Sequence, residues 1–114
     1  MRITSDLFVS ALMRRAFAAG GFAAIERRGA AEAGAIFVVA RSRMGELTLF
    51  GPAPQTSYEE GRPDRLFAEL VRSDDPGEVT ARLDKEARFD PDLWIVEVEL
   101  EGPLLSELVP IRKP

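Results

Sequence analysis

Residues 34–41, GAIFVVAR, form the densest apolar run in the chain and place apolar side chains on both faces of a strand. Valine, isoleucine and phenylalanine favour strands. An apolar run without alternation is typical of a strand whose sheet is covered on both sides. We therefore predict that this segment is the central strand of the domain.

The N-terminal pattern predicts an amphipathic helix over about residues 6–19. Thr4, Ser5 and Asp6 are residue types that cap helix N-termini, and Gly20-Gly21 is a typical helix end. Helical spacing places six apolar residues on one half of the wheel, which we expect to be buried. They are Phe8, Val9, Leu12, Met13, Ala16 and Phe17.

A second helix is predicted to begin after Asp75 and to end before Pro91. Asp75 is a suitable N-cap, Pro76 stands at the first helical position, and Glu78 completes a variant of the capping box. An apolar stripe is expected to face the core. Its members are Val79, Leu83 and Ala87, and Phe89 is expected to cap the core.

Three early segments predict an antiparallel meander. Residues 22–28 are a weak strand candidate, and residues 46–50 alternate between apolar and polar positions. A turn at 41–45, with glycine in a special backbone conformation, would join the latter to the apolar run in a hairpin.

Two later segments add strands. Residues 93–100 place Trp94, Val96 and Val98 on one face, which indicates one buried side. Residues 65–71 fit either a short helix or a strand, and we favour the strand.

The connections are rich in small residues and proline. Residues 29–34 are expected to be flexible. Pro52 and Pro54 cannot donate sheet hydrogen bonds, so the chain is expected to leave the sheet there. Residues 51–64 would then form the longest loop.

The pattern as a whole predicts an α+β fold in one domain, residues 1–101, with a C-terminal tail, residues 102–114. We expect an N-terminal helix, an antiparallel sheet of four to five strands and a second helix before the last strand. Both helices are expected on one face. We favour a short helical tail that packs back on the domain; the alternative is an exposed apolar tail that binds a partner.

Composition narrows the chemistry. The 114 residues include no histidine and no cysteine, so imidazole and thiol catalysis are excluded. No apolar run is long enough for a membrane span, and we expect a cytoplasmic protein. The net charge is −4, which makes nucleic-acid binding the least favoured function. We expect no cofactor and predict no metal site.

Four segments resemble a family of small alphaproteobacterial proteins, domain of unknown function 1491. They are residues 5–15 (SDLFVSALMRR), 34–39 (GAIFVV), 49–55 (LFGPAPQ) and 86–97 (EARFDPDLWIVE). The resemblance covers about residues 2–100 and leaves out the tail after Gly102. It implies a bacterial, cytoplasmic setting and supplies no activity, cofactor or partner.

Three constellations are candidates for binding. Asp90 and Asp92 flank a proline, where a carboxylate pair or an ordinary turn both fit, and we favour the turn. The 51–64 loop carries polar side chains that could line a pocket. Arginines of the first half could converge on an anion, or could be solvated charges. The candidate ligand-binding residues are Arg14, Arg15, Arg41, Gln55, Tyr58, Asp90 and Asp92.

No motif in the sequence identifies a reaction. The favoured function is a non-catalytic protein-binding or interaction module, which could bind another protein through the tail. The alternative is a small enzyme or anionic-ligand-binding protein, with a site around the 51–64 loop, the arginines of the first half, and Asp90 and Asp92.

Overall fold

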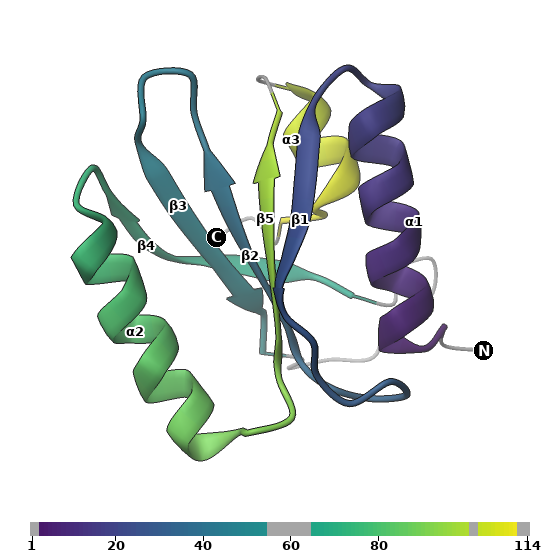
Figure 1. Ribbon diagram of the computed structural model, residues 1–114, viewed down its shortest axis with the longest axis vertical. Helices are drawn as coiled ribbons and strands as arrows, with labels where there is room; N and C mark the ends of the chain where they lie inside the picture. Colours follow the sequence, from purple (N-terminus) through teal and green to yellow (C-terminus); the bar gives the residue numbers. More distant parts are fainter. Residues whose placement is uncertain (1–2, 55–64, 101–102, 112–114) are drawn as a thin grey trace.

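The computed structural model describes residues 3–54, 65–100 and 103–111, which form a five-stranded sheet and three helices (Figure 1). None of the helices in these ranges is long and apolar enough to cross a membrane. The elements are α1 (Ser5–Ala18), β1 (Phe22–Arg27), β2 (Ile36–Arg41), β3 (Leu47–Pro52), β4 (Phe67–Ser73), α2 (Pro76–Phe89), β5 (Trp94–Glu99) and α3 (Pro103–Leu108).

The fold class is the predicted α+β, but the sheet is mixed. Its order is β1-β5-β2-β3-β4. The β2–β3 hairpin and the antiparallel β3–β4 pair agree with the predicted meander. The expectation for β1 was wrong, because β5 lies between β1 and β2 and runs parallel to β2. Parallel pairing needs a crossover, which α2 provides between β4 and β5, and the apolar pattern of single strands carries no such information.

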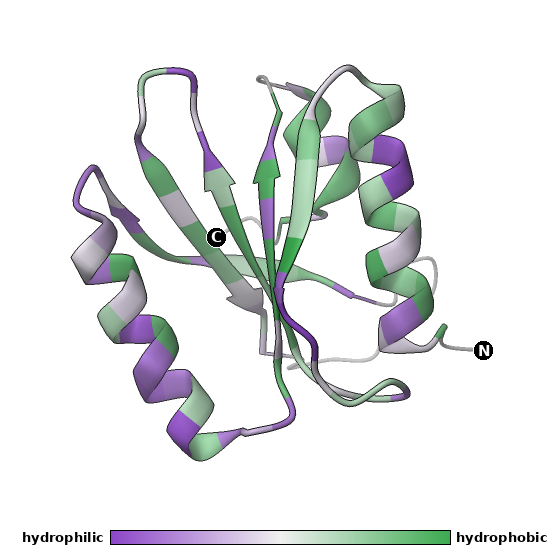
Figure 2. Ribbon diagram, in the orientation of Figure 1, coloured by the Kyte–Doolittle hydropathy of each residue, from purple (hydrophilic) through white to green (hydrophobic). Residues whose placement is uncertain are grey.

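The helices cover opposite faces of the sheet, so the prediction that both lie on one face was wrong (Figures 1 and 2). Ile36, Val38 and Ala40 of β2 pack in the cluster with α1 and α3, whereas Phe37 and Val39 pack in the cluster with α2. Alternate residues of a strand point to opposite faces. Coverage of both faces therefore explains why the β2 run has no polar position before Arg41.

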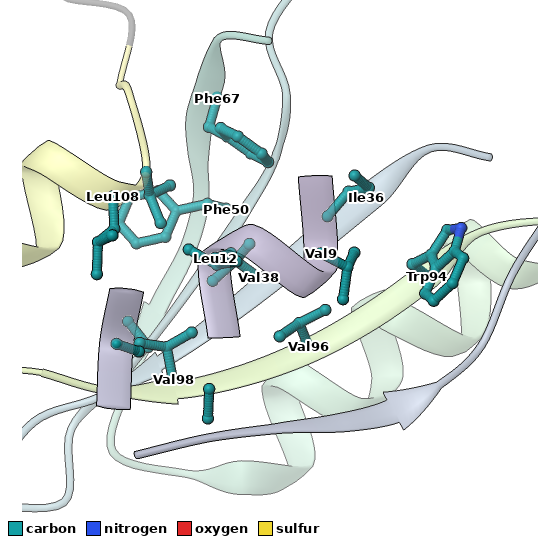
Figure 3. Close-up of a cluster of buried hydrophobic side chains, with 14 residues drawn as sticks. Val9, Leu12, Ile36, Val38, Phe50, Phe67, Trp94, Val96, Val98 and Leu108 are labelled. Atoms are coloured by element: carbon teal, nitrogen blue, oxygen red, sulfur yellow. The ribbon is translucent and has the colours of Figure 1, made fainter. Parts of the chain in front are cut away.

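The larger core cluster lies between the sheet and the helices α1 and α3 (Figure 3). Trp94, Val96 and Val98 of β5 are buried in it, as predicted. Leu108 and Val109 are buried there as well, and the Phe67 N–H donates to the Pro110 carbonyl at 2.8 Å. The described part of the tail therefore packs back on the domain.

Both long helices form where predicted, but each has one phenylalanine outside its buried stripe. Asp75 caps α2 by accepting a 2.9 Å hydrogen bond from the Gly77 N–H. Phe89 is 82% exposed and Phe17 is 51% exposed, against expectation. At 100° per residue, each lies about 100–120° from the centre of its helix's buried stripe, and so faces away from the core.

The segment for which a strand was favoured over a helix forms strand β4, Phe67–Ser73. Its pairing with β3 shows that the chain does not leave the sheet at Pro52, as was expected. Pro52 belongs to β3 and stands opposite Phe67 of β4. Pairing between β3 and β2 ends at Phe50, so Pro52 has one neighbouring strand. A proline is accepted in a strand where no ladder hydrogen bond is required of it.

The connection before β2 is tightly bound, although its composition suggested flexibility. It supplies the Glu32 and Ala31 carbonyls that accept from the N–H groups of Ser5 and Asp6 at the start of α1. The Ser5 hydroxyl donates to the Gly34 carbonyl at 2.6 Å. The two carbonyl groups thus accept from N–H groups at the beginning of α1, which were expected to bind capping side chains.

The same connection holds the beginning of β5. The Trp94 indole Nε1 donates to the Ala30 carbonyl at 2.8 Å, and the Trp94 backbone N–H donates to the Ala35 carbonyl at 2.7 Å. The Ala30 N–H donates to the Asp92 carbonyl at 2.9 Å. A Cβ atom at Gly29 or Gly34 would overlap the Asp92 carbonyl oxygen, so this approach requires glycine.

Substitution Gly29→Ala should lower the free energy of unfolding by about 1–3 kcal/mol, because the methyl group meets backbone rather than a movable side chain. Urea unfolding followed by Trp94 fluorescence measures the change. Gly77→Ala is the matched control, since its Cβ would meet only the Asp75 carboxylate, and it should be neutral or stabilising. Equal stability of Gly29→Ala and the wild type would contradict the packing.

Candidate functional site

The structure separates the candidate residues predicted from the sequence. Arg41 ends β2 opposite Glu99 of β5, while Asp92 lies two residues before the start of β5. At about 3.3 Å per residue, Arg41 and Asp92 are about 20 Å apart along the sheet. The arginine and the aspartates therefore do not form one site. Gln55, Tyr58 and most of the 51–64 loop lie outside the described residues.

Asp90 and Asp92 form the turn between α2 and β5, which is the interpretation favoured from the sequence. The Asp90 side chain accepts from the Asp92 N–H at 3.1 Å, and the Arg27 guanidinium donates to the Pro91 carbonyl at 3.0 Å. Within the described residues, no group of three or more acidic side chains is arranged to hold a metal ion.

Arg14 and Arg15 are exposed on α1. Arg15 borders a hollow of 310 Å³ between the end of α1 and α3. Arg41 borders a second hollow of 460 Å³, which crosses the ends of the three strands β1, β5 and β2. The two hollows share Ala19 and Leu104. We call them together the α1/α3 groove, and the elements that form it meet at the top of Figure 1.

The groove has apolar walls that are open to solvent. Phe22 and Leu104 line it and are 45% and 37% exposed, and Leu100 lines it as well. Phe17 stands edge-on to Phe22, with ring centroids 6.0 Å apart. Gly20 has a φ of +85°, which ends α1 and turns the chain into β1 at this wall.

Charged groups surround these walls on five segments. Arg15 comes from α1, Arg41 from β2, Arg43 from the hairpin, Glu99 from β5 and Glu107 from α3. Hydrophilic segments at the ends of β2 and β5 are visible in Figure 2. The groove thus combines aromatic and aliphatic walls with a rim of both signs, in which arginine predominates.

A cluster of carboxyl groups orients Arg41. Its Nε lies 3.1 Å from Glu97 Oε1 and 3.5 Å from Glu99 Oε1. A hydrogen bond with Glu97 raises the pKa of Glu26, and burial and the Glu97 charge add to the rise. The hydrogen bond from Glu26 lowers the pKa of Glu97, which Arg41 lowers further against the effect of burial. Glu26 is therefore the carboxyl group of this pair that takes up a proton first as the pH falls.

A second arginine, Arg65, serves the structure. It is 8% exposed, and its Nη2 donates to the Ser5 hydroxyl at 3.1 Å and the Ile3 carbonyl at 3.2 Å. Its guanidinium lies over the Phe8 ring, 5.5 Å from the centroid. Arg65 joins the beginning of α1 to the segment before β4, which gives it a sufficient structural role.

Comparison with known proteins identifies the family. The family model described as "Protein of unknown function (DUF1491)" matches residues 3–103. The chain belongs to the DUF1491 family. No curated protein matches it.

Three solved structures, two of them described as DUF1491 family proteins, share this fold. A solution structure from A. tumefaciens is 46% identical over 100% of this chain and 98% of its own, with a TM-score of 0.84. A crystal structure from Caulobacter crescentus is 38% identical over 86% of this chain and 88% of its own, with a TM-score of 0.74. An NMR structure from the same species is 34% identical over 99% of both chains, with a TM-score of 0.77.

Sequence reasoning did not find the groove of this DUF1491 protein. Phe17 was expected to be buried, and Phe22 was only part of a weak strand. Glu97 and Glu99 were recognisable as polar residues on one face of the last strand. Their proximity to Glu26 and Arg41 depends on the insertion of β5 between β1 and β2, which single-strand patterns do not reveal.

Substitution Glu26→Gln should make stability less dependent on pH. Because the pKa of Glu26 is raised in the folded state, the stability from its protonated form is present below the ordinary glutamate pKa and is lost as the pH rises through the raised value. Glutamine keeps a donor to Glu97 at every pH. Its advantage over the wild type should therefore grow as the pH rises above the ordinary glutamate pKa of about 4 and through the raised pKa of Glu26.

Urea unfolding at a series of pH values measures this difference. The exposed Glu32 supplies the control substitution Glu32→Gln, whose difference from the wild type should change little over the same range. A difference for Glu26→Gln that is constant with pH would contradict the raised pKa of Glu26.

Proposed function

We propose that this DUF1491 protein is a non-catalytic interaction module of the bacterial cytoplasm, which binds another protein through the α1/α3 groove. The observation that carries the proposal is that partly exposed Phe22 and Leu104 line one hollow, with the exposed ring of Phe17 packed against Phe22 beside it. Clustered apolar side chains with a polar rim are typical of protein-binding surfaces.

The exposed aromatic rings of Phe17 and Phe22 support a binding role more strongly than the size of the apolar surface does. Phe37, Phe50 and Phe67 are buried in the core, which shows that the fold has places for aromatic rings. Phe17 and Phe22 instead pack on each other at the surface. Rings beside a concave surface can supply most of the binding energy of an interface. Phe89 is also exposed, but it stands at the far end of α2 from this groove.

The tail takes a different part in this proposal from the one expected from the sequence. Leu108 and Val109 point into the core, while Leu104 lines the groove. The described tail therefore contributes one wall of the binding surface. A partner would contact α3 where it is docked, and no part of α3 would have to detach.

A second candidate function is the binding of a small anionic molecule. The larger hollow, at 460 Å³, has the volume of a typical ligand site, and Arg41 and Arg43 line it. The exposed Phe22 ring, which lines the same hollow, favours the protein partner.

A photo-crosslinking residue placed at position 22 should capture the same protein in repeated experiments in alphaproteobacterial cells. Placed at position 89, it should not capture that protein, because Phe89 is exposed but outside the groove. Mass spectrometry identifies the captured protein. Equal capture from both positions would contradict the proposal.

Direct binding of the captured protein, once purified, completes the test. Phe22→Ala should weaken binding at least about tenfold, since an anchoring ring contributes more than 1 kcal/mol. Phe89→Ala should leave the affinity unchanged. Calorimetry measures both, and equal affinities of the two variants would exclude the groove as the site.

The anionic-ligand alternative predicts a higher melting temperature with nucleotides, sugar phosphates or organic acids. A thermal-shift screen of the wild type and Arg41→Ala measures this. A ligand that stabilises the wild type and not the variant would favour the alternative.

A further inference from the structure

Among the residues that the structure describes, Arg41 forms its ion pairs and its hydrogen bond through Nε. Its Nε donates to Glu97 and lies close to Glu99. Within the described residues, neither Nη group of Arg41 donates a hydrogen bond to another side chain or to the backbone. The end of the side chain that forms two-pronged pairs with carboxylates thus has its donors available.

The surroundings hold Arg41 in place. Its partners Glu97 and Glu99 are two residues apart on β5, and β5 pairs with β2 along the whole length of both strands. The side chain of Arg41 is 39% exposed and that of Glu97 is 20% exposed. A guanidinium oriented in this way loses little rotational freedom when it binds, which favours recognition over simple charge attraction.

The charge around Arg41 would repel an acidic partner if all three nearby carboxyl groups were ionised. The pKa of Glu26 is raised, mainly by its hydrogen bond with Glu97, which makes its neutral form more accessible than that of an ordinary glutamate. Arg43 lines the same hollow as Glu99, and Arg15 lines the adjoining hollow together with Glu107. The positive charges of these two arginines offset the negative charges of the two glutamates. The local field at the groove is therefore more favourable to an anion than the net charge of −4 suggests.

We infer that the groove binds a protein segment in which a carboxylate side chain stands close to a large apolar side chain. The carboxylate pairs with the Nη groups of Arg41, and the apolar side chain packs on Phe22 and Leu104 at the wall of the same hollow. This inference rests on the proposed function and specifies the chemistry of the partner. The apolar contact supplies affinity, and the ion pair between Arg41 and the carboxylate selects acidic segments.

A phage-displayed library of random peptides, selected on the wild-type protein, is the probe. Peptides whose binding is lost with Phe22→Ala should share an aspartate or glutamate next to a leucine or phenylalanine. Fluorescence anisotropy with one synthetic peptide of this set then measures affinity. Arg41→Lys keeps the positive charge but removes the guanidinium group that can donate two hydrogen bonds to one carboxylate, so it should weaken binding about tenfold. Phe89→Ala should not change the affinity.

The peptide itself provides a test that does not depend on the folding of any variant. Replacing its acidic residue with the corresponding amide should weaken binding to the wild type about tenfold. The same replacement should have little effect on binding to Arg41→Lys, because the two changes remove one interaction.

The outcomes separate the inference from the proposed function. Peptides that require Phe22 but carry no acidic residue, or that bind Arg41→Lys as well as the wild type, would overturn the inference and leave the groove as a protein-binding site. A selection in which no peptide depends on Phe22 would overturn both.

Discussion

The position of β5 between β1 and β2 is the constraint on which the rest of the structure depends. β5 pairs on one side with β1 and on the other with β2, and its first residue, Trp94, is bound through backbone and indole to the connection that precedes β2. That connection also caps α1 through its carbonyls. One short segment therefore sets the register of the central strand and the position of the first helix.

The candidate site follows from this arrangement. Glu97 and Glu99 reach Arg41 because β5 is parallel to β2, and Glu97 reaches Glu26 because β5 also pairs with β1. The end of β5 continues to Leu100 and α3, which complete the apolar wall of the groove. The chemistry of the groove is thus assembled from strand ends that are far apart in the sequence.

Local patterns predicted the elements well, because each element is determined by nearby residues. The Asp75 cap, the alternation from Trp94 to Val98 and the unbroken apolar run of β2 each indicate one conformation. Strand order and helix placement depend on contacts between segments far apart in the chain. The predictions of a fully antiparallel sheet and of helices on one face were therefore wrong. The run of β2 held a clue, since a strand with two buried faces implies cover on both sides. The groove was not predictable, because its walls are the residues left outside buried stripes.

Native-state hydrogen exchange, read by NMR, tests the central claim most directly. If the segment before β2 and the beginning of β5 form one unit, the amide protons of Ala30 and Trp94 should exchange with the same free energy and denaturant dependence as those in the middle of β5. All should exchange only through global unfolding. Exchange of the Ala30 and Trp94 amides by local opening, while β5 stays protected, would contradict the account.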